Sequence, residues 1–365
     1  MNEDSKIFVA GHNGLVGSAI VENLKYKGYK NIITKNRDEL DLLCQNSVKN
    51  FFKQEKPDYV FMAAAKVGGI IANNKYRADF IYENLQVQNN VIHQCYLHGV
   101  KKLLFLGSTC IYPKSSPQPM KEEYLLTSEL EYTNEPYAIA KIAGIKMCES
   151  YNIQYGTNFV SVMPTNLYGP NDNFDLETSH VLPALIRKIH LAKLLNENKF
   201  DEVLKDLGYD DIKIAKTYLN EFGVSSERVE IWGSGKPMRE FLWSKDMADA
   251  CVFIMENVNF NNLFNDNKVY FACKDESLDF KTVEVKNTHI NIGTGSDISI
   301  QDLANKIKDI VGFNGQLYFN TNKPDGTIKK LTDVTKLNKL GWKHSIELDE
   351  GIRKMYQYYL SKEER

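Results

Sequence analysis

Three glycines follow the first apolar run of the chain, and their position limits the fold more than any other feature. The run covers 7–10, the glycines are Gly11, Gly14 and Gly17 in the spacing G-x-x-G-x-x-G, and apolar residues at helical spacing begin at Leu15. Glycines allow a tight turn from a strand into a helix, where unpaired amide groups at the helix N-terminus attract a pyrophosphate. The sequence therefore predicts a strand, turn and helix that bind a dinucleotide.

The first half of the chain alternates short β-branched runs with helical patterns. The expected strands are 7–10, 31–34, 59–62, 103–107 and 159–163, and the clearest expected helices are 15–26 and 80–98. Strands that alternate with helices in this way form parallel sheets covered on both faces. We therefore expect an α/β fold with a Rossmann-type doubly wound parallel sheet.

Beyond Pro170 this alternation stops, which predicts a second, smaller domain. A helix is expected at 181–190, and two amphipathic helices around Gly208 are expected within an insertion at about 191–227. The simplest interpretation of the insertion is a solvent-exposed helical segment with no catalytic part. The alternative is a part in the substrate pocket or in an oligomer contact.

The two domains are expected to interleave, because the predicted helix 246–255 and strand 290–292 return to the first domain. The expected NADP-binding domain covers 1–172, with returning segments near 240–258 and 288–292. The expected substrate domain covers 173–239 and 293–365, including the insertion.

Composition and charge exclude several classes of function. The 365 residues are 43% hydrophobic with a net charge of −2, so no general basic field attracts nucleic acid or anionic lipid. The segment 1–6 lacks the basic and apolar parts of a signal peptide, and no apolar run approaches about 18 residues. The six cysteines show neither C-x-x-C spacing nor a zinc-like histidine pattern. We therefore expect a cytoplasmic enzyme with reduced thiols, no metal and a small-molecule substrate.

Basic residues after the second expected strand indicate which dinucleotide is bound. Lys35-Asn36-Arg37 occupies the position where an NAD enzyme usually has an acidic residue for the ribose hydroxyl. Cations there suit a 2′-phosphate and hence NADP; the alternative is a solvated basic turn. Asp41, Leu42 and the loop 63–66, which contains Ala64, are expected to flank adenine and ribose.

Three residues have the chemistry and order needed to reduce a ketone. Tyr137 and Lys141 are four residues apart, so on a helix they share one face. A lysine ammonium beside the phenol is expected to lower the tyrosine pKa, which makes it a better acid near neutral pH. Ser108, at the carboxyl end of a strand, can hydrogen-bond the same carbonyl oxygen. Nearby Cys110 could remove protons from carbons next to that ketone if it has thiolate character.

Further motifs run through nearly the whole chain. They are 63–69 (AAAKVGG), 110–113 (CIYP), 134–141 (NEPYAIAK), 164–170 (PTNLYGP), 232–235 (WGSG), 239–241 (REF) and 323–327 (KPDGT). With these motifs the chain resembles the extended short-chain dehydrogenases/reductases and, among them, the GDP-L-fucose synthase family. It departs from the family pattern at Asn13, where an arginine often helps to hold the NADP phosphate, so NADP preference depends more on Arg37.

The resemblance implies NADPH-dependent reduction of the C4 ketone of a GDP-4-keto-6-deoxy sugar, after epimerisation at C3 and C5, in nucleotide-sugar biosynthesis for surface glycans. Ser108, Tyr137 and Lys141 match the reducing triad, while Cys110 and His180 match the pair that removes and returns protons. A homodimer, formed through the helices 80–98 and 137–151, is also implied.

The expected binding residues fall into two groups. The cofactor group comprises Gly11, Asn13, Gly14, Leu15, Val16, Gly17, Arg37, Asp41, Leu42, Ala64, Lys141, Pro164, Asn166 and Leu167. The GDP-sugar group comprises Lys188, Trp232 and Arg239, with Lys330 as a weaker candidate. The planar fork of Arg239 suits a diphosphate.

Other functions stay open. A C4 reductase could act on a related GDP-4-keto hexose or heptose that is epimerised elsewhere, and the motifs do not identify the sugar. A 4,6-dehydratase is disfavoured, because Ser108-Thr109-Cys110 lacks the Asp-Glu pair used for elimination. A non-catalytic dinucleotide sensor would be expected to lose the triad or the anion-binding cations, and both are present.

Overall fold

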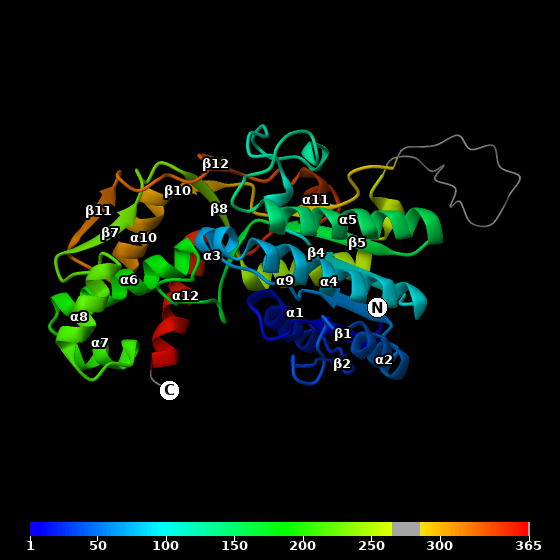
Figure 1. Ribbon diagram of the computed structural model, residues 1–365, viewed down its shortest axis with the longest axis horizontal. Coiled ribbons are helices and arrows are strands. Elements are labelled where there is room, and N and C mark those ends of the chain that lie inside the picture. The colour runs from blue at the N-terminus through cyan, green and yellow to red at the C-terminus, as the bar shows by residue number, and fades with distance from the viewer. Residues whose placement is uncertain (265–284, 364–365) are drawn as a thin grey trace, which may run out of the picture. The chain divides into compact units, whose positions relative to one another are not determined.

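The computed structural model describes residues 1–264 and 285–363, and the chain divides into two compact units (Figure 1). Unit 1 contains Met1–Leu167, Ser244–Gly295 and Thr332–Ser345, and unit 2 contains Tyr168–Trp243, Ser296–Leu331 and Ile346–Arg365. The segment 332–345 therefore lies in unit 1, whereas the sequence analysis assigned all of 293–365 to the substrate domain. Cys273 lies outside the described residues.

Unit 1 is built on a parallel sheet, which confirms the predicted fold class. Its strands run in the order β2-β1-β3-β4-β5-β9, and every neighbouring pair is parallel. The strands are β1 (Ile7–Ala10), β2 (Ile32–Ile33), β3 (Tyr59–Met62), β4 (Lys102–Leu106), β5 (Phe159–Pro164) and β9 (Ile290–Ile292). The inner strands are buried on both faces, as parallel strands between two helix layers are. The strand expected at 31–34 is shorter because β2 is an edge strand that pairs only with β1.

Helices cover both faces of this sheet. They are α1 (Leu15–Tyr26), α2 (Gln45–Glu55), α3 (Ile70–Lys75), α4 (Arg77–Leu97), α5 (Glu135–Tyr155), α9 (Ser244–Asn257) and α11 (Thr335–Lys339), with short 3₁₀ turns η1 (Thr109–Ile111), η2 (Glu122–Tyr124) and η3 (Phe260–Asn262). Helices α4 and α5 pack side by side, and α1 packs against α9. Alternate strand residues such as Phe8, Val60 and Phe105 share one core with α2, α4 and α5. This period of two is what a sheet buried on both faces requires.

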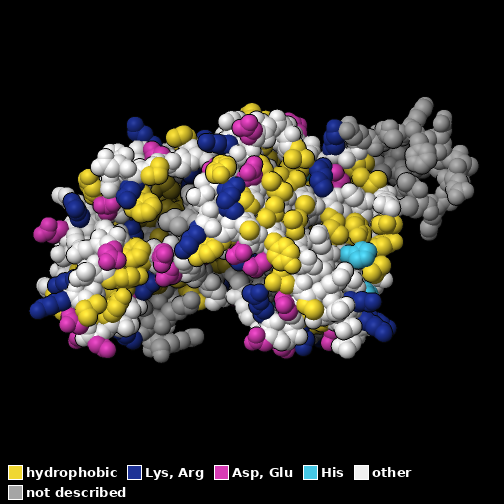
Figure 2. All heavy atoms as spheres, in the orientation of Figure 1, with side chains coloured by type: hydrophobic (Ala, Val, Ile, Leu, Met, Phe, Trp, Pro, Cys, Tyr) yellow, Lys and Arg dark blue, Asp and Glu magenta, His cyan; other side chains and the backbone are white. Residues whose placement is uncertain are grey.

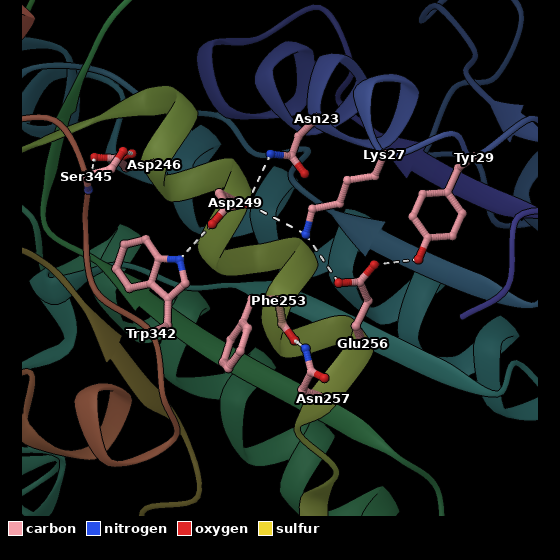
Figure 3. Close-up of polar contacts among 10 residues, drawn as sticks. All are labelled: Asn23, Lys27, Tyr29, Asp246, Asp249, Phe253, Glu256, Asn257, Trp342 and Ser345. Atoms are coloured by element: carbon pink, nitrogen blue, oxygen red, sulfur yellow. Dashed lines mark hydrogen bonds and ion pairs between the residues drawn. The ribbon is translucent and has the colours of Figure 1, made fainter.

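Polar contacts fasten α1 to α9 (Figure 3). Glu256 accepts from Lys27 Nζ at 3.2 Å and from the Tyr29 hydroxyl at 2.5 Å. Asp249 accepts from Trp342 Nε1 at 2.9 Å, so the late segment 332–345 is joined to the same helix. Helix α9 is thus bonded both to the residues that follow α1 and to the late segment 332–345.

Unit 2 surrounds its own apolar core. Its elements are α6 (Val181–Asn196), α7 (Phe200–Leu207), α8 (Ile212–Glu221), β7 (Arg228–Trp232), β8 (Met238–Trp243), β10 (Asp297–Ser299), α10 (Ile300–Val311), β11 (Gln316–Asn320), β12 (Lys329–Lys330) and α12 (Leu348–Glu363). The chain passes from unit 1 to unit 2 within strand β6 (Asn166–Tyr168). β7 pairs with β11 in parallel, while β8 pairs antiparallel with β10 and in parallel with β12. The core lies between these strands and the apolar faces of α6, α10 and α12.

The predicted helix pair in the insertion is confirmed, but the pair is not a solvent-exposed segment. Helices α7 and α8 flank Gly208, which ends α7 in a left-handed conformation with φ +69°. Val203, Ala215 and Leu219 are fully buried in the core of unit 2. The helix expected at 181–190 continues to Asn196, because the next residues also favour a helix.

Candidate active site

The turn between β1 and α1 is packed so closely that it excludes side chains. A Cβ atom on Gly17 would lie 2.1 Å from the Gly11 carbonyl oxygen, and one on Gly11 would lie 2.7 Å from the Ala64 nitrogen. Gly11 also has φ +84°, which favours glycine. Gly14 is the N-cap residue of α1, and no side chain caps the helix, which begins with 15–16. The backbone amides at this N-terminus are therefore accessible to an anion, so the residues fit a dinucleotide pyrophosphate.

One cation lies free near this turn. Asn13 Nδ2 donates to Asn36 Oδ1 at 2.8 Å, which links the glycine turn to the loop after β2. In that loop Lys35 is paired with Glu39 at 3.3 Å. Arg37 is exposed, and its side chain has no partner within the described parts of the chain. Of the two basic residues in the motif, Arg37 is the one available for a phosphate.

Two buried asparagines of α4 fix the loops expected to flank adenine and ribose. Asn90 Nδ2 donates to the Leu42 carbonyl at 2.9 Å, next to Asp41, which accepts from a backbone amide in its own turn at 3.0 Å. Asn84 forms two bonds of 3.0 Å with the backbone of Lys66, one as donor and one as acceptor. Neither asparagine was predicted from the sequence, although polar residues at buried positions of a predicted helix were a usable signal.

The predicted reducing residues and Cys110 gather at the carboxyl end of β4. Ser108 Oγ accepts from the Cys110 amide at 3.3 Å, and Ser108 also hydrogen-bonds the phenol of Tyr137. Lys141 Nζ donates to the Leu106 carbonyl at 2.8 Å and lies 5.7 Å from the centroid of the Tyr137 ring. One element, α5, supplies both the phenol and the ammonium from the same face.

The pKa of Tyr137 is raised, whereas the sequence predicts that the nearby lysine lowers it. Burial raises the pKa of Tyr137, the nearby Cys110 thiol raises it further, and only the bond to Ser108 lowers it. Burial also lowers the pKa of Lys141 to about 7. The expectation was wrong because desolvation of the phenolate dominates, while the lysine nitrogen bonds a backbone carbonyl. A neutral phenol is the form that can donate a proton.

Tyr112 anchors the turn that carries Cys110. Its hydroxyl donates to Asn291 Oδ1 at 2.6 Å and lies 3.1 Å from His289 Nε2. Asn291 Nδ2 donates to the Met120 carbonyl at 2.9 Å, so its oxygen is the acceptor and the hydroxyl accepts from His289. Burial lowers the pKa of His289 to about 3, so the ring is neutral and its proton is on Nε2. The 110–113 motif is evident in the sequence, but this anchor was not predicted from it.

Three residues of the predicted cofactor group, which the resemblance places beside the nicotinamide, lie at the end of the neighbouring strand β5 and just beyond it. Pro164 is the last residue of β5, and Asn166 and Leu167 lie in β6 just beyond it. β5 is parallel to β4, with Val162 opposite Leu106. The carboxyl ends of the two strands thus share the edge where open α/β sheets bind ligands.

Two predicted site residues lie on α6 in unit 2. His180 is the N-cap residue of this helix, with an exposed side chain, and desolvation by nearby protein lowers the pKa of its imidazole. Lys188, two turns further on, donates to the Glu230 carbonyl at 3.5 Å, and burial lowers its pKa. Cys110 belongs to unit 1, so the predicted proton-transfer pair is divided between the units.

The remaining predicted substrate residues lie on strands of unit 2: Arg239 and Lys330 on the paired strands β8 and β12, and Trp232 on β7 of a separate two-stranded sheet. Arg239 Nη1 donates to the backbone carbonyls of Met238 at 2.7 Å and Thr327 at 2.6 Å. Its guanidinium has no acidic partner within the described part of the chain, and Lys330 is its Cα partner in the β8/β12 pair. Trp232, at the end of β7, is 54% exposed. An uncompensated guanidinium and an exposed indole suit a nucleoside diphosphate.

Other types of site are not found in the described residues. Within 1–264 and 285–363, no three His, Cys, Asp or Glu side chains form a group that could hold a metal ion. No helix in these ranges is long and apolar enough to span a membrane. The thiols of Cys44, Cys95, Cys110, Cys148 and Cys251 are free.

Comparisons with known proteins agree with this fold. Residues 7–265 match the NAD dependent epimerase/dehydratase family. GDP-L-fucose synthase 1 of Arabidopsis thaliana is 49% identical over 359 residues, which cover 98% of this chain and 94% of the relative. A solved GDP-6-OMe-4-keto-L-xylo-heptose reductase from C. jejuni is 51% identical, with a TM-score of 0.92 and 99% of both chains covered. A GDP-mannoheptose C4 reductase from Campylobacter jejuni, solved with NADP bound, is 50% identical, with a TM-score of 0.87 and 99% of both chains covered.

The family model spans more than half of the chain, and the curated relative matches it almost from end to end. The chain belongs to the NAD dependent epimerase/dehydratase family and, within it, to the GDP-L-fucose synthase family.

Proposed function

We propose that this chain is an NADPH-dependent enzyme that epimerises C3 and C5 of a GDP-4-keto-6-deoxy sugar and then reduces its C4 ketone. The observation that carries the proposal is the cluster of Ser108, Cys110, Tyr137 and Lys141 after β4, in the same unit as the glycine turn. Unit 1 then binds the cofactor and unit 2 the GDP-sugar. The names of the relatives support the same substrate class.

The proposed cofactor is NADPH, which supplies the hydride when bound. The turn, which has no room for a side chain at Gly11 or Gly17, holds the pyrophosphate, and Arg37 pairs with the 2′-phosphate. Pro164 and the two residues 166–167 hold the nicotinamide at the carboxyl edge of the sheet. The solved relative with NADP bound supports this choice.

Reduction needs one proton at the C4 oxygen for each hydride that reaches C4. Tyr137 donates this proton, since its raised pKa keeps the phenol neutral near pH 7. The hydroxyl of Ser108 donates a hydrogen bond to the same oxygen and stabilises the charge that develops there. Lys141, on the same face of α5, orients the cofactor ribose and supplies positive charge when protonated.

Epimerisation uses the same oxygen-binding groups before reduction. Hydrogen bonds from Ser108 and Tyr137 stabilise the enolate, which makes the protons at C3 and C5 acidic. Cys110, as the thiolate, removes one of these protons, and His180 returns a proton to the carbon. Lys188, with Arg239, Trp232 and Lys330, holds the GDP portion.

A second candidate function is C4 reduction without epimerisation, on a GDP-4-keto heptose or hexose. It is favoured by the 51% identity to a heptose reductase, which slightly exceeds the identity to the fucose synthase. Incubation with a GDP-4-keto sugar in deuterium oxide, without NADPH, separates the two. Deuterium at C3 and C5 supports the epimerase, and loss of exchange in Cys110→Ser and His180→Asn assigns the pair.

Unlabelled C3 and C5, together with NADPH consumption by the same preparation, would establish the simple reductase instead. NMR of the products from defined hexose and heptose substrates then identifies the sugar. If no GDP-4-keto sugar supports NADPH oxidation, both catalytic proposals are wrong.

We also propose that the enzyme acts in the cytoplasm as a homodimer that is formed through α4 and α5. Figure 2 shows hydrophobic side chains gathered over these helices, and Tyr82, Leu97, Ile139 and Tyr155 are among the large exposed apolar residues of the protein. Such a patch is typical of a contact between protein molecules. Light scattering should give twice the chain mass for the wild type and a monomer for Leu97→Lys; a monomeric wild type would rule out the dimer.

A further inference from the structure

The loop 323–327, between β11 and β12, touches two of the predicted substrate-binding residues. Lys323 Nζ lies 5.0 Å from the ring centroid of Trp232, and the Thr327 carbonyl accepts from Arg239 Nη1 at 2.6 Å. A Cβ atom on Gly326 would come within 3.0 Å of Arg239 Nη2. One short loop therefore lies against both the indole and the guanidinium.

Asp325 joins this loop to the turn that follows Trp232. One carboxylate oxygen accepts from the Ser234 amide at 2.8 Å, and the other accepts from the Ser234 hydroxyl at 2.7 Å. Both hydrogen bonds lower the pKa of Asp325, so the carboxylate is charged at neutral pH. Charge-assisted bonds of this kind are stronger than neutral ones.

The partner turn is shaped to receive this carboxylate. A Cβ atom on Gly233 would lie 2.2 Å from Asp325 Oδ1, and Gly233 has φ +82°. Glycine is thus required at 233 both by the backbone conformation and by the space that the carboxylate occupies. The motifs 232–235 and 323–327, which are 91 residues apart along the chain, form one structural unit.

We propose that Asp325 is a positioning residue for GDP-sugar binding: it locks the loop 323–327 onto the turn after Trp232 and so fixes Trp232 and Arg239 together. The inference rests on the proposed function, because it takes these two residues as the ones that hold the nucleoside diphosphate. Asp325 acts through other residues and touches no reacting atom. Its loss therefore weakens substrate binding and leaves the chemical step intact.

The test is steady-state kinetics of the full chain with Asp325→Ala. We expect KM for the GDP-4-keto sugar to rise about tenfold, equivalent to about 1.4 kcal/mol of binding, with kcat and the KM for NADPH within about twofold of wild type. Asp325→Asn keeps an acceptor for the Ser234 amide, so its KM for the GDP-4-keto sugar should lie between those of the wild type and Asp325→Ala. Asp309→Ala, which removes an exposed acid on α10 of the same unit, should behave as wild type.

A double-mutant cycle tests whether the contact itself matters. If Asp325 acts through Ser234, adding Ser234→Ala to Asp325→Ala should raise KM by less than it does in the wild type. An unchanged KM for the sugar in Asp325→Ala, or equal changes in both KM values, would overturn the proposal.

Calorimetry with GDP alone separates this inference from the proposed function. Weaker GDP binding in Asp325→Ala, with normal NADPH binding, supports the positioning role even if no GDP-4-keto sugar is turned over. Equal GDP affinity in wild type and variant contradicts it, whatever the enzyme reduces. Asp325→Asn serves as the second variant if the alanine substitution unfolds unit 2.

Discussion

Gly17 leaves no room for even a methyl group, so Gly17→Ala is expected to disrupt the cofactor turn. The added Cβ would lie 2.1 Å from the Gly11 carbonyl oxygen, and backbone must move to relieve the contact. We expect NADPH affinity to fall by at least about tenfold, or about 1.4 kcal/mol, as measured by calorimetry. Gly69→Ala is the control, because no atom lies within 4 Å of its added Cβ. Unchanged NADPH binding in Gly17→Ala would show that this turn does not hold the cofactor.

Tyr112→Phe tests the anchor behind Cys110. Without the hydroxyl, Asn291 Oδ1 and the His289 Nε2 proton lose a buried partner, which costs about 1–3 kcal/mol in the free energy of unfolding. Urea denaturation measures this loss. Tyr124→Phe, whose hydroxyl makes no described hydrogen bond, should leave stability unchanged. Equal stability of both variants would mean that the anchor contributes nothing.

For individual residues, the sequence predicts which side chains form the site, but it does not predict how deeply each is buried or what it bonds. The spacing of Tyr137 and Lys141, with Ser108 at a strand end, identified a group that the structure brings together. It gave the wrong direction for the tyrosine pKa, because burial depends on atoms that are distant in sequence. Asn291 was missed for the same reason, since it bonds a backbone group 171 residues away.

At the scale of the elements, a buried lysine links strand β4 to helix α9. Lys102 Nζ donates to the carbonyls of Ile254 and Met255, each at 2.8 Å, near the C-terminal end of α9. Burial lowers its pKa to about 8, against about 10.4 in an unfolded chain. Between these values the unfolded chain binds more protons, so the free energy of unfolding rises with pH, by at most about 3 kcal/mol from this group.

Urea denaturation of the wild type and of Lys102→Met between about pH 7 and pH 10 measures this effect. The stability of the wild type relative to the variant should increase as the pH rises through 8. A difference that stays constant over this range would mean that Lys102 is charged in the folded protein.

Regular elements with clear periodicity could be predicted to the residue. Strands 7–10, 59–62 and 290–292 and helix 15–26 have the expected bounds. The predicted length of β2 was wrong because this strand pairs on one side only. The predicted end of α6 was wrong because the residues after 190 also favour a helix and continue it. The insertion was separated from α6 at a change in composition that does not interrupt the helix.

At the scale of the whole molecule, the break in rhythm after Pro170 lies close to the passage from unit 1 to unit 2 at residues 167 and 168. The assignment of Thr332–Ser345 could not be predicted, because this segment adds no strand to the sheet of unit 1. It joins through side-chain contacts such as Trp342 with Asp249 and Ser345 with Asp246 (Figure 3).

A chain truncated after residue 331 should therefore fail to form a stable unit 1, although it retains every strand of the sheet. It loses the bond from Trp342 to Asp249 and the acceptor that the Asp333 carbonyl provides for Asn291. Limited proteolysis should cleave within 1–167 much faster than in the full chain. Removal of residues 364–365 alone is the control, and protection of 1–167 in the longer truncation would contradict the prediction.

The contact between Trp342 and Asp249 also orders events during protein synthesis. Asp249 is translated 93 residues before its partner, and Trp342 must also pass the exit tunnel before the two can meet. Helix α9 of the nascent unit 1 therefore stays incompletely covered until almost the entire polypeptide has been made. Ribosome stalling before this point would release a chain that cannot finish either unit, and chaperones would meet it with an unprotected apolar surface.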